Sequence, residues 1–215
     1  VLIDYLCSFS AILEKGKILI GRDSRPTGPM ITSLVKSILN WLGRDTEDLG
    51  IVPTPVVLYG VLQGNFAGGI IITASHNPIE WNALKFVNGK GKFTSPEEFS
   101  RMQKHYKSKN FTFKDYSEIG QNSLNNEIPR SHINKIFSFI NSESIINSNF
   151  KVVLDAVNGA GGKKKKKFLN RVGCKIKIIN GEPTGNFGRP PEPKPENLSD
   201  LSNAILENKA DIGFA

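Results

Sequence analysis

Hydrophobic positions along the chain follow two periods, and their alternation predicts a series of strands and helices. Apolar residues recur every fourth position within 27–42, and Gly43 follows as a C-cap, which predicts a helix there. Runs rich in β-branched residues at 17–21, 67–73, 151–157 and 174–179 are typical of buried strands. Strands that alternate with crossover helices predict an α/β fold with mixed, mostly parallel sheets sandwiched by helices.

A polar stretch divides this pattern into two parts. Residues 111–127 are rich in Asn and Ser and lose the hydrophobic period, which indicates a boundary between a domain over 1–125 and a second over 126–215. Before that stretch, 82–94 reads as two short strands about an Asn88-Gly89 turn, and after it a helix is predicted from about residue 128 to residue 140. The last strand stops in mid-run and the first helix has no strand before it, so we expect the chain to be truncated at both ends.

Composition narrows the class of protein. The 215 residues are 39% hydrophobic and 22% charged, and no apolar run reaches the roughly 20 residues that a membrane span needs. The two cysteines, Cys7 and Cys174, have no metal-type spacing, which favours core residues of a cytoplasmic protein.

The net charge of +8 invites a nucleic-acid interpretation, but a single block, Lys163–Lys167, supplies five of these charges and leaves 8 − 5 = +3. The other basic residues are scattered, so the charge does not favour nucleic-acid binding. The block itself lies where a helix needs an apolar face. It is either a functional polybasic patch or an altered stretch of sequence.

One predicted strand is followed closely by a serine. The stretch GGIIITASHNPIEWNALKFV, residues 68–87, runs from β-branched residues into Ser75, His76, Asn77 and Pro78. Ligands of open α/β sheets bind at the carboxyl ends of strands. A bare serine is nevertheless a weak nucleophile that needs activation. Taken alone, these four residues are better explained as a turn closed by proline.

Two further segments follow predicted strands. GRDSRPTG, residues 21–28, places two arginines around Asp23, which suits either anion binding or a local salt-bridged turn. DAVNGAGG, residues 155–162, fails the phosphate-loop pattern and the dinucleotide fingerprint, and a tight turn into a helix explains it better.

Together these segments resemble the α-D-phosphohexomutases, the superfamily of phosphoglucomutases, phosphomannomutases and phosphoglucosamine mutases. The resemblance covers nearly the whole chain and is most specific in TASHNP. It rests on GRDSRPTGPM, GIVPTP, GGIIITASHNPIEWNALKF, DAVNGAGG and GEPTGNFGRPPEPKPENL in family order. Within the family, the chain looks most like the phosphoglucosamine and phosphomannose mutase branch.

The resemblance implies roles for five residues. Ser75 matches the phosphoserine that donates its phosphate to the sugar, and His76 and Asn77 would orient that phosphate. Lys85 matches the proton-transfer lysine, and Arg25 matches an arginine of the motif near the substrate cleft, so that Arg25 and Asn77 would bind the substrate. A phosphoserine is already activated, which would explain why no base adjoins Ser75.

The implied reaction interconverts hexose or hexosamine 6-phosphate and 1-phosphate through a 1,6-bisphosphate, with phosphoglucosamine mutase favoured over phosphomannomutase or phosphoglucomutase. The implied cofactor is Mg²⁺, held by the phosphate on Ser75 and by an Asp-Gly-Asp-x-Asp loop that would follow Ala215. A non-catalytic phosphosugar-binding fragment is the alternative from another functional class. We expect neither a nucleic-acid nor a membrane partner, and the sequence leaves the oligomeric state open.

Overall fold

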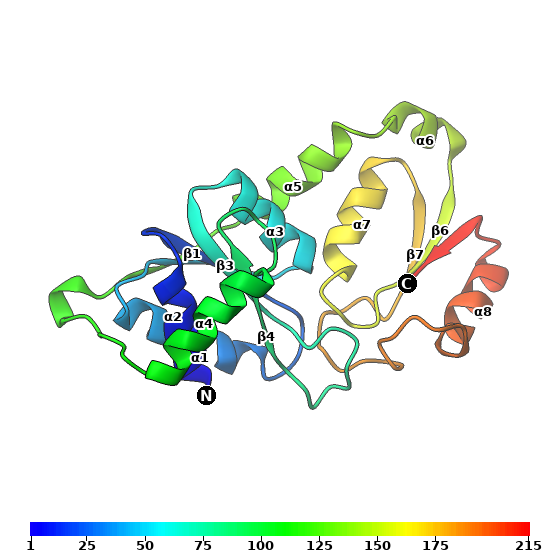
Figure 1. Ribbon diagram of the computed structural model, residues 1–215. Coiled ribbons are helices and arrows are strands. Elements are labelled where there is room, and N and C mark those ends of the chain that lie inside the picture. Colours follow the sequence, from blue (N-terminus) through cyan, green and yellow to red (C-terminus); the bar gives the residue numbers. More distant parts are fainter. The chain divides into compact units, whose positions relative to one another are not determined.

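The computed structural model describes the main chain of residues 1–215 and every side chain except those of Lys163, Lys164 and Lys165. The question that the Lys163–Lys167 block raised therefore falls largely outside the described side chains. The residues form two units, each with its own sheet (Figure 1). The first unit is Val1–Arg22, Thr27–Thr73 and Ala83–Pro129; the second is Asp23–Pro26, Ala74–Asn82 and Arg130–Ala215. Two loops that follow strands of the first unit thus group with the second.

The sheet of the first unit has five strands in the order β4-β3-β1-β2-β5. Its strands are β1 (Lys17–Arg22), β2 (Thr46–Ile51), β3 (Phe66–Ile72), β4 (Leu84–Asn88) and β5 (Asn122–Leu124). All neighbours are parallel except β3 and β4, which are antiparallel and place Ile71 opposite Lys85. This sheet confirms the mixed, mostly parallel arrangement that the hydrophobic pattern predicts.

Both faces of this sheet are covered because its central strands are apolar at successive positions. Ile18 and Ile20 of β1 pack in one buried cluster with α1, α2 and α4, whereas Leu19 between them packs in a second cluster with α3. Successive strand residues point to opposite faces, so a continuous apolar run requires helices on both sides. The helical elements are α1 (Leu2–Ile12), α2 (Gly28–Trp41), α3 (Thr54–Gln63), α4 (Pro96–Ser108) and the 3₁₀ turn η1 (Tyr116–Glu118).

The sheet of the second unit is parallel throughout, in the order β7-β6-β8. Its strands are β6 (Lys151–Asp155), β7 (Lys175–Ile179) and β8 (Ile212–Phe214). Helix α8 (Ser199–Asn208) packs on this sheet (Figure 1), and its Leu201 and Ala204 cluster with the buried Val153 of β6. The other helical elements are α5 (Glu127–Phe137), which begins in the last residues of the first unit, α6 (Ser142–Ser148), α7 (Gly162–Arg171) and the 3₁₀ turn η2 (Pro195–Asn197).

Three local predictions were wrong or incomplete. The predicted second arm of the hairpin after Asn88 is reduced to one bridge between Val87 and Phe93. The helix predicted to reach residue 140 ends at Phe137, and a separate helix α6 follows. Strand β2, which lies between β1 and β5, was not predicted, because its residues TEDLGI carry two carboxylates. Those carboxylates are paired in the fold, Glu47 with Lys17 at 3.0 Å and Asp48 with Lys36 at 3.1 Å.

The two cysteines lie at different depths in the fold. Cys7 is buried and Cys174 half-buried, and both thiols are free. Burial raises the pKa of both thiols, and Asp4 adds to the effect at Cys7. Across the part of the chain that the structure describes, no helix is long and apolar enough to cross a membrane.

Candidate functional site

Ser75 lies in an exposed loop directly after the buried end of β3. Thr73 and Ala74 are still buried, whereas Ser75 to Pro78 are exposed. Ser75 has a left-handed backbone with φ 57°, which is uncommon for a residue other than glycine. The amide of Asn77 and its side-chain Nδ2 both donate to the carbonyl of Ala74, at 3.1 and 2.7 Å. The turn expected from SHNP is therefore present, and it presents Ser75 at the surface.

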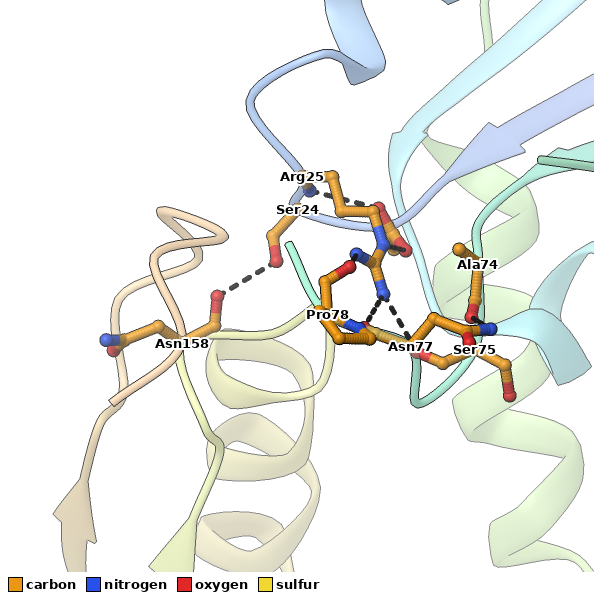
Figure 2. Close-up of polar contacts among 8 residues, drawn as sticks. Ser24, Arg25, Ala74, Ser75, Asn77, Pro78 and Asn158 are labelled. Atoms are coloured by element: carbon orange, nitrogen blue, oxygen red, sulfur yellow. Dashed lines mark hydrogen bonds and ion pairs between the residues drawn. The ribbon is translucent and has the colours of Figure 1, made fainter. Parts of the chain in front are cut away.

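Arg25, which belongs to the GRDSR segment, holds this loop through hydrogen bonds. Its side chain is 0% exposed, and its guanidinium donates to the carbonyls of Pro78 at 2.5 Å, Asn77 at 2.7 Å and Ser75 at 3.2 Å (Figure 2). Its Nε donates to the carboxylate of Asp23 at 3.0 Å, and that carboxylate also accepts the Arg25 amide at 3.0 Å. Of the two interpretations left open for GRDSR, the salt-bridged turn is thus present, and the arginine is committed to main-chain oxygens.

His76 faces a cavity beside the loop. The cavity measures about 610 Å³, and its walls are His76, Pro78 and Ile79 on one side and the proline-rich loop over 186–197 on the other. That loop contributes Phe187, whose ring lies 5.1 Å from the guanidinium carbon of Arg25. Sequence reasoning missed this contact because nothing in the spacing of Arg25 and Phe187 indicates it.

The turn after β6 holds the proline-rich loop in place. Asp155 is 0% exposed at its side chain and accepts from Arg189 Nε at 2.6 Å, Asn180 Nδ2 at 3.0 Å and the Val157 amide at 3.0 Å. Asn158, in a left-handed conformation, accepts from the Ser24 hydroxyl at 2.9 Å (Figure 2). DAVNGAGG is therefore the tight turn that the sequence indicates, and within the second unit it also contacts Ser24.

The main chain of Ser24 passes so close to Gly185 that no larger residue fits there. Gly185 has φ 71°, and a Cβ added there would lie 2.2 Å from the carbonyl oxygen of Ser24. Only glycine accommodates both conditions. The stretch TGNFGR thus passes directly against GRDSR, and Arg25 lies beneath its phenylalanine.

Lys85 belongs to the first unit and lies on β4, opposite Ile71 of β3. Its side chain is half-buried, and its ammonium lies 5.8 Å from the centroid of the Phe93 ring. The other four candidate residues, Arg25, Ser75, His76 and Asn77, belong to the second unit. The structure therefore brings four of the five predicted site residues together in one unit.

The described residues do not make a metal site by themselves. No group of three or more His, Cys, Asp or Glu side chains within the described residues is placed to hold an ion. Mg²⁺ prefers oxygen ligands in a near-octahedral arrangement, and Asp155 is already occupied by Arg189 and Asn180. The residues present therefore do not fit Mg²⁺ without further ligands.

Comparison with protein families decides the assignment of the chain. Residues 5–113 match the family model for phosphoglucomutase/phosphomannomutase, alpha/beta/alpha domain I, and residues 130–215 match the model for domain II. The chain belongs to the phosphoglucomutase/phosphomannomutase family. Its resemblance to the phosphohexomutases is thereby confirmed.

Individual members of the family agree. The chain is 34% identical to a phosphoglucomutase/phosphomannomutase of Thermococcus kodakarensis over 203 residues, 94% of this chain and 44% of the relative. It is 32% identical to a phosphoglucosamine/phosphogalactosamine mutase of Sulfurisphaera tokodaii over 209 residues, 94% of this chain and 45% of the relative. The chain thus spans less than half the length of these curated relatives.

A crystal structure of a family protein from Burkholderia thailandensis has the same fold. It superposes with a TM-score of 0.84 at 24% identity, covering 100% of this chain and 47% of that one. At this identity the likeness bears on the fold alone. The α/β architecture is therefore shared with about half of the Burkholderia protein.

Proposed function

We propose that the chain is the phosphoserine-bearing part of an intramolecular phosphotransferase that acts on hexose or hexosamine phosphates. The observation that carries the proposal is the position of Ser75, exposed at the carboxyl end of β3 in a loop whose carbonyls are held by Arg25. Family membership supports it, because TASHNP is the most specific part of the resemblance. The domain bounds 1–125 and 126–215 and the cytoplasmic location belong to the same proposal.

In the proposed reaction, Ser75 carries a phosphoryl group and transfers it to a hydroxyl of the sugar phosphate. The bond between phosphorus and Ser75 Oγ breaks, and a bond from phosphorus to the sugar oxygen forms. The hydroxyl loses its proton to Lys85, which acts as a general base. The resulting 1,6-bisphosphate turns around and returns its other phosphoryl group to Ser75 Oγ. The bond from that phosphorus to its sugar oxygen breaks, and the freed oxygen takes the proton back from Lys85. Such a transfer depends on positioning and on charge stabilisation more than on covalent help from the protein.

His76 and Asn77 orient the phosphate in this scheme. Both are exposed and flank Ser75 on the loop. His76 also lines the cavity of about 610 Å³ that opens next to the loop. Mg²⁺, the cofactor that the resemblance implies, would offset phosphate charge when bound; among the described residues, the phosphate on Ser75 is the ligand that we assign to it.

The substrate that we favour is a hexosamine phosphate, which makes the protein a phosphoglucosamine mutase. The name of the Sulfurisphaera relative supports this choice. Phosphomannomutase or phosphoglucomutase activity is the alternative within the family, supported by the name of the Thermococcus relative. A non-catalytic phosphosugar-binding protein is the alternative from another class.

A turnover assay distinguishes these functions. The protein expressed from the complete reading frame is given glucosamine, mannose or glucose 6-phosphate with Mg²⁺ and a trace of the matching 1,6-bisphosphate. We expect conversion to the 1-phosphate, fastest with glucosamine 6-phosphate, and its loss in Ser75→Ala. Ser37→Ala, which removes an exposed hydroxyl on α2, is the matched control and should keep full activity. Binding of the sugar phosphates without conversion would instead support the binding protein.

A further inference from the structure

We propose that Arg25 is a positioning residue for Ser75 and not a ligand of the substrate phosphate, and that Phe187 shields it from water. The proposal rests on the proposed function of Ser75 and deepens it. It changes the role that the resemblance implied for Arg25. It also brings the proline-rich loop, to which the sequence assigned no role, into the site.

Most of the donors of the Arg25 guanidinium are already bonded within the protein. A guanidinium has five N–H donors and no acceptor. Arg25 makes four hydrogen bonds, three to the carbonyls of Ser75, Asn77 and Pro78 and one to the Asp23 carboxylate. Its side chain is 0% exposed. A group that is buried and bonded in this way cannot reach a phosphate without releasing the loop.

These bonds hold Ser75 in an uncommon conformation. Ser75 has φ 57°, which L-residues other than Asn and Asp seldom adopt. Its carbonyl and those of Asn77 and Pro78 converge on one guanidinium, as Figure 2 shows. Within the loop, the amide and side chain of Asn77 donate to Ala74, and the Trp81 amide donates to Pro78. Arg25 adds three bonds to main-chain carbonyls of the loop from another segment of the chain.

The ring of Phe187 covers the guanidinium of Arg25. The Phe187 ring lies 5.1 Å from its guanidinium carbon, within the range of a cation–π contact. Phe187 is held there from both sides, because Gly185 passes against Ser24 and Arg189 is paired with the buried Asp155. Hydrogen bonds shielded from water are electrostatically stronger. The proline-rich loop therefore strengthens the hold of Arg25 on the Ser75 loop.

The chain contains a matched control for this role. Arg44 also donates to main-chain oxygens, those of Ser10 at 2.8 Å, Leu13 at 3.1 Å and Glu14, and so caps the end of α1. It belongs to the first unit. Arg44→Lys removes the same kind of contact from a place where it serves only a helix end.

Amide hydrogen exchange of the 215-residue chain tests the positioning role without any assay of activity. The probe is the amide of Asn77, which is bonded to Ala74 within the loop. We expect Arg25→Lys and Phe187→Leu to speed its exchange, about tenfold or more for Arg25→Lys, while the amide of Ile70 in β3 exchanges as before. Arg44→Lys should leave Asn77 unchanged. Phe187→Leu retains Arg25, so this variant still tests the proposal if Arg25→Lys does not fold.

Kinetics in the protein from the complete reading frame then separate positioning from binding. A misplaced Ser75 lowers transfer, so kcat should fall about tenfold or more in Arg25→Lys while KM stays within about twofold. Unchanged Asn77 exchange in both variants, or a raised KM with kcat retained, would overturn the proposal and return Arg25 to substrate binding. If the wild-type protein has no mutase activity, the proposed function fails, and the exchange experiment still decides the role of Arg25.

Discussion

The buried pair of Asp155 and Arg189 should stabilise the second unit far more than any exposed ion pair of the chain. Arg189→Met tests this, because it removes the cation and keeps most of the side-chain volume. Asp155 would retain its bonds from Asn180 and the Val157 amide, both at 3.0 Å, and lose the bond from Arg189 Nε at 2.6 Å. The exposed fractions of the two side chains are 0% and 7%, so water does not replace the lost partner.

The magnitude follows from this burial. Removing one partner of a buried ion pair leaves an uncompensated charge and costs about 3–5 kcal/mol. Because two hydrogen bonds to Asp155 survive, we expect the lower end, about 3 kcal/mol of unfolding free energy. The matched control lies in the same loop: Lys194 pairs with Glu192 at 2.9 Å, but their side chains are 54% and 48% exposed. Lys194→Met should cost at most about 1 kcal/mol.

Amide exchange resolves the two units of the chain and is therefore the assay. A loss of about 3 kcal/mol speeds exchange roughly 100-fold, because each 1.4 kcal/mol is a factor of ten. We expect this acceleration at Val153 in β6 and no change at Leu19 in β1. The double variant Arg189→Met with Asp155→Asn should recover part of the lost unfolding free energy, since it no longer contains the unpaired carboxylate.

Two outcomes would refute the reasoning. If Arg189→Met and Lys194→Met changed exchange at Val153 equally, burial would not control the value of the pair. If Arg189→Met accelerated Leu19 as much as Val153, the pair would not act on the second unit alone.

Three further predictions concern activity and pH. In the protein from the complete reading frame, Lys85→Ala should lower kcat by about 10²–10⁴-fold with little change in sugar-phosphate binding; wild-type turnover would make Lys85 an ordinary strand lysine. The 215-residue chain alone should not convert glucosamine or mannose 6-phosphate, because its described residues provide no metal site; steady conversion that Ser75→Ala abolishes would contradict this. Glu98 forms a capping box with Ser95 at the start of α4; although desolvation opposes the shift, hydrogen bonds from Asn88 and Ser95 lower its pKa. Its ionised form is therefore favoured in the fold, and stability should be lost as the pH falls through that lowered pKa. Urea unfolding across pH 3 to 6 should show a smaller loss in Glu98→Gln, and an equal loss would exclude Glu98 as the cause.

The layers of the fold could be predicted because the central strands are apolar at successive positions. Ile18, Leu19 and Ile20 require cover on both faces, and the structure provides it with α1 and α2 on one side and α3 on the other. Strand β2 escaped prediction because its carboxylates Glu47 and Asp48 become acceptable in a sheet only once lysines from other elements pair with them. Such pairing depends on tertiary structure and leaves no periodic trace in the sequence.

The candidate site also has a part that the sequence predicts and a part that it does not. Ser75 and its neighbours could be singled out because they follow a strand end and match a specific family motif. The contacts that hold them could not, since Arg25 lies 50 residues from Ser75 and Asp155 lies 34 residues from Arg189. The sequence alone does not distinguish an arginine that binds carbonyls from an arginine that binds phosphate. Their burial and partners distinguish them only in the folded chain.

The central claim, that Ser75 carries the transferred phosphate, is tested most directly by mass spectrometry of the protein from the complete reading frame. Intact-mass analysis should show a fraction of molecules with one added phosphate, and peptide mapping should place it on Ser75. Ser75→Ala should abolish this fraction, and incubation with a hexose 1,6-bisphosphate should raise it in the wild type. A phosphate on another residue, or full mutase activity in Ser75→Ala, would contradict the account.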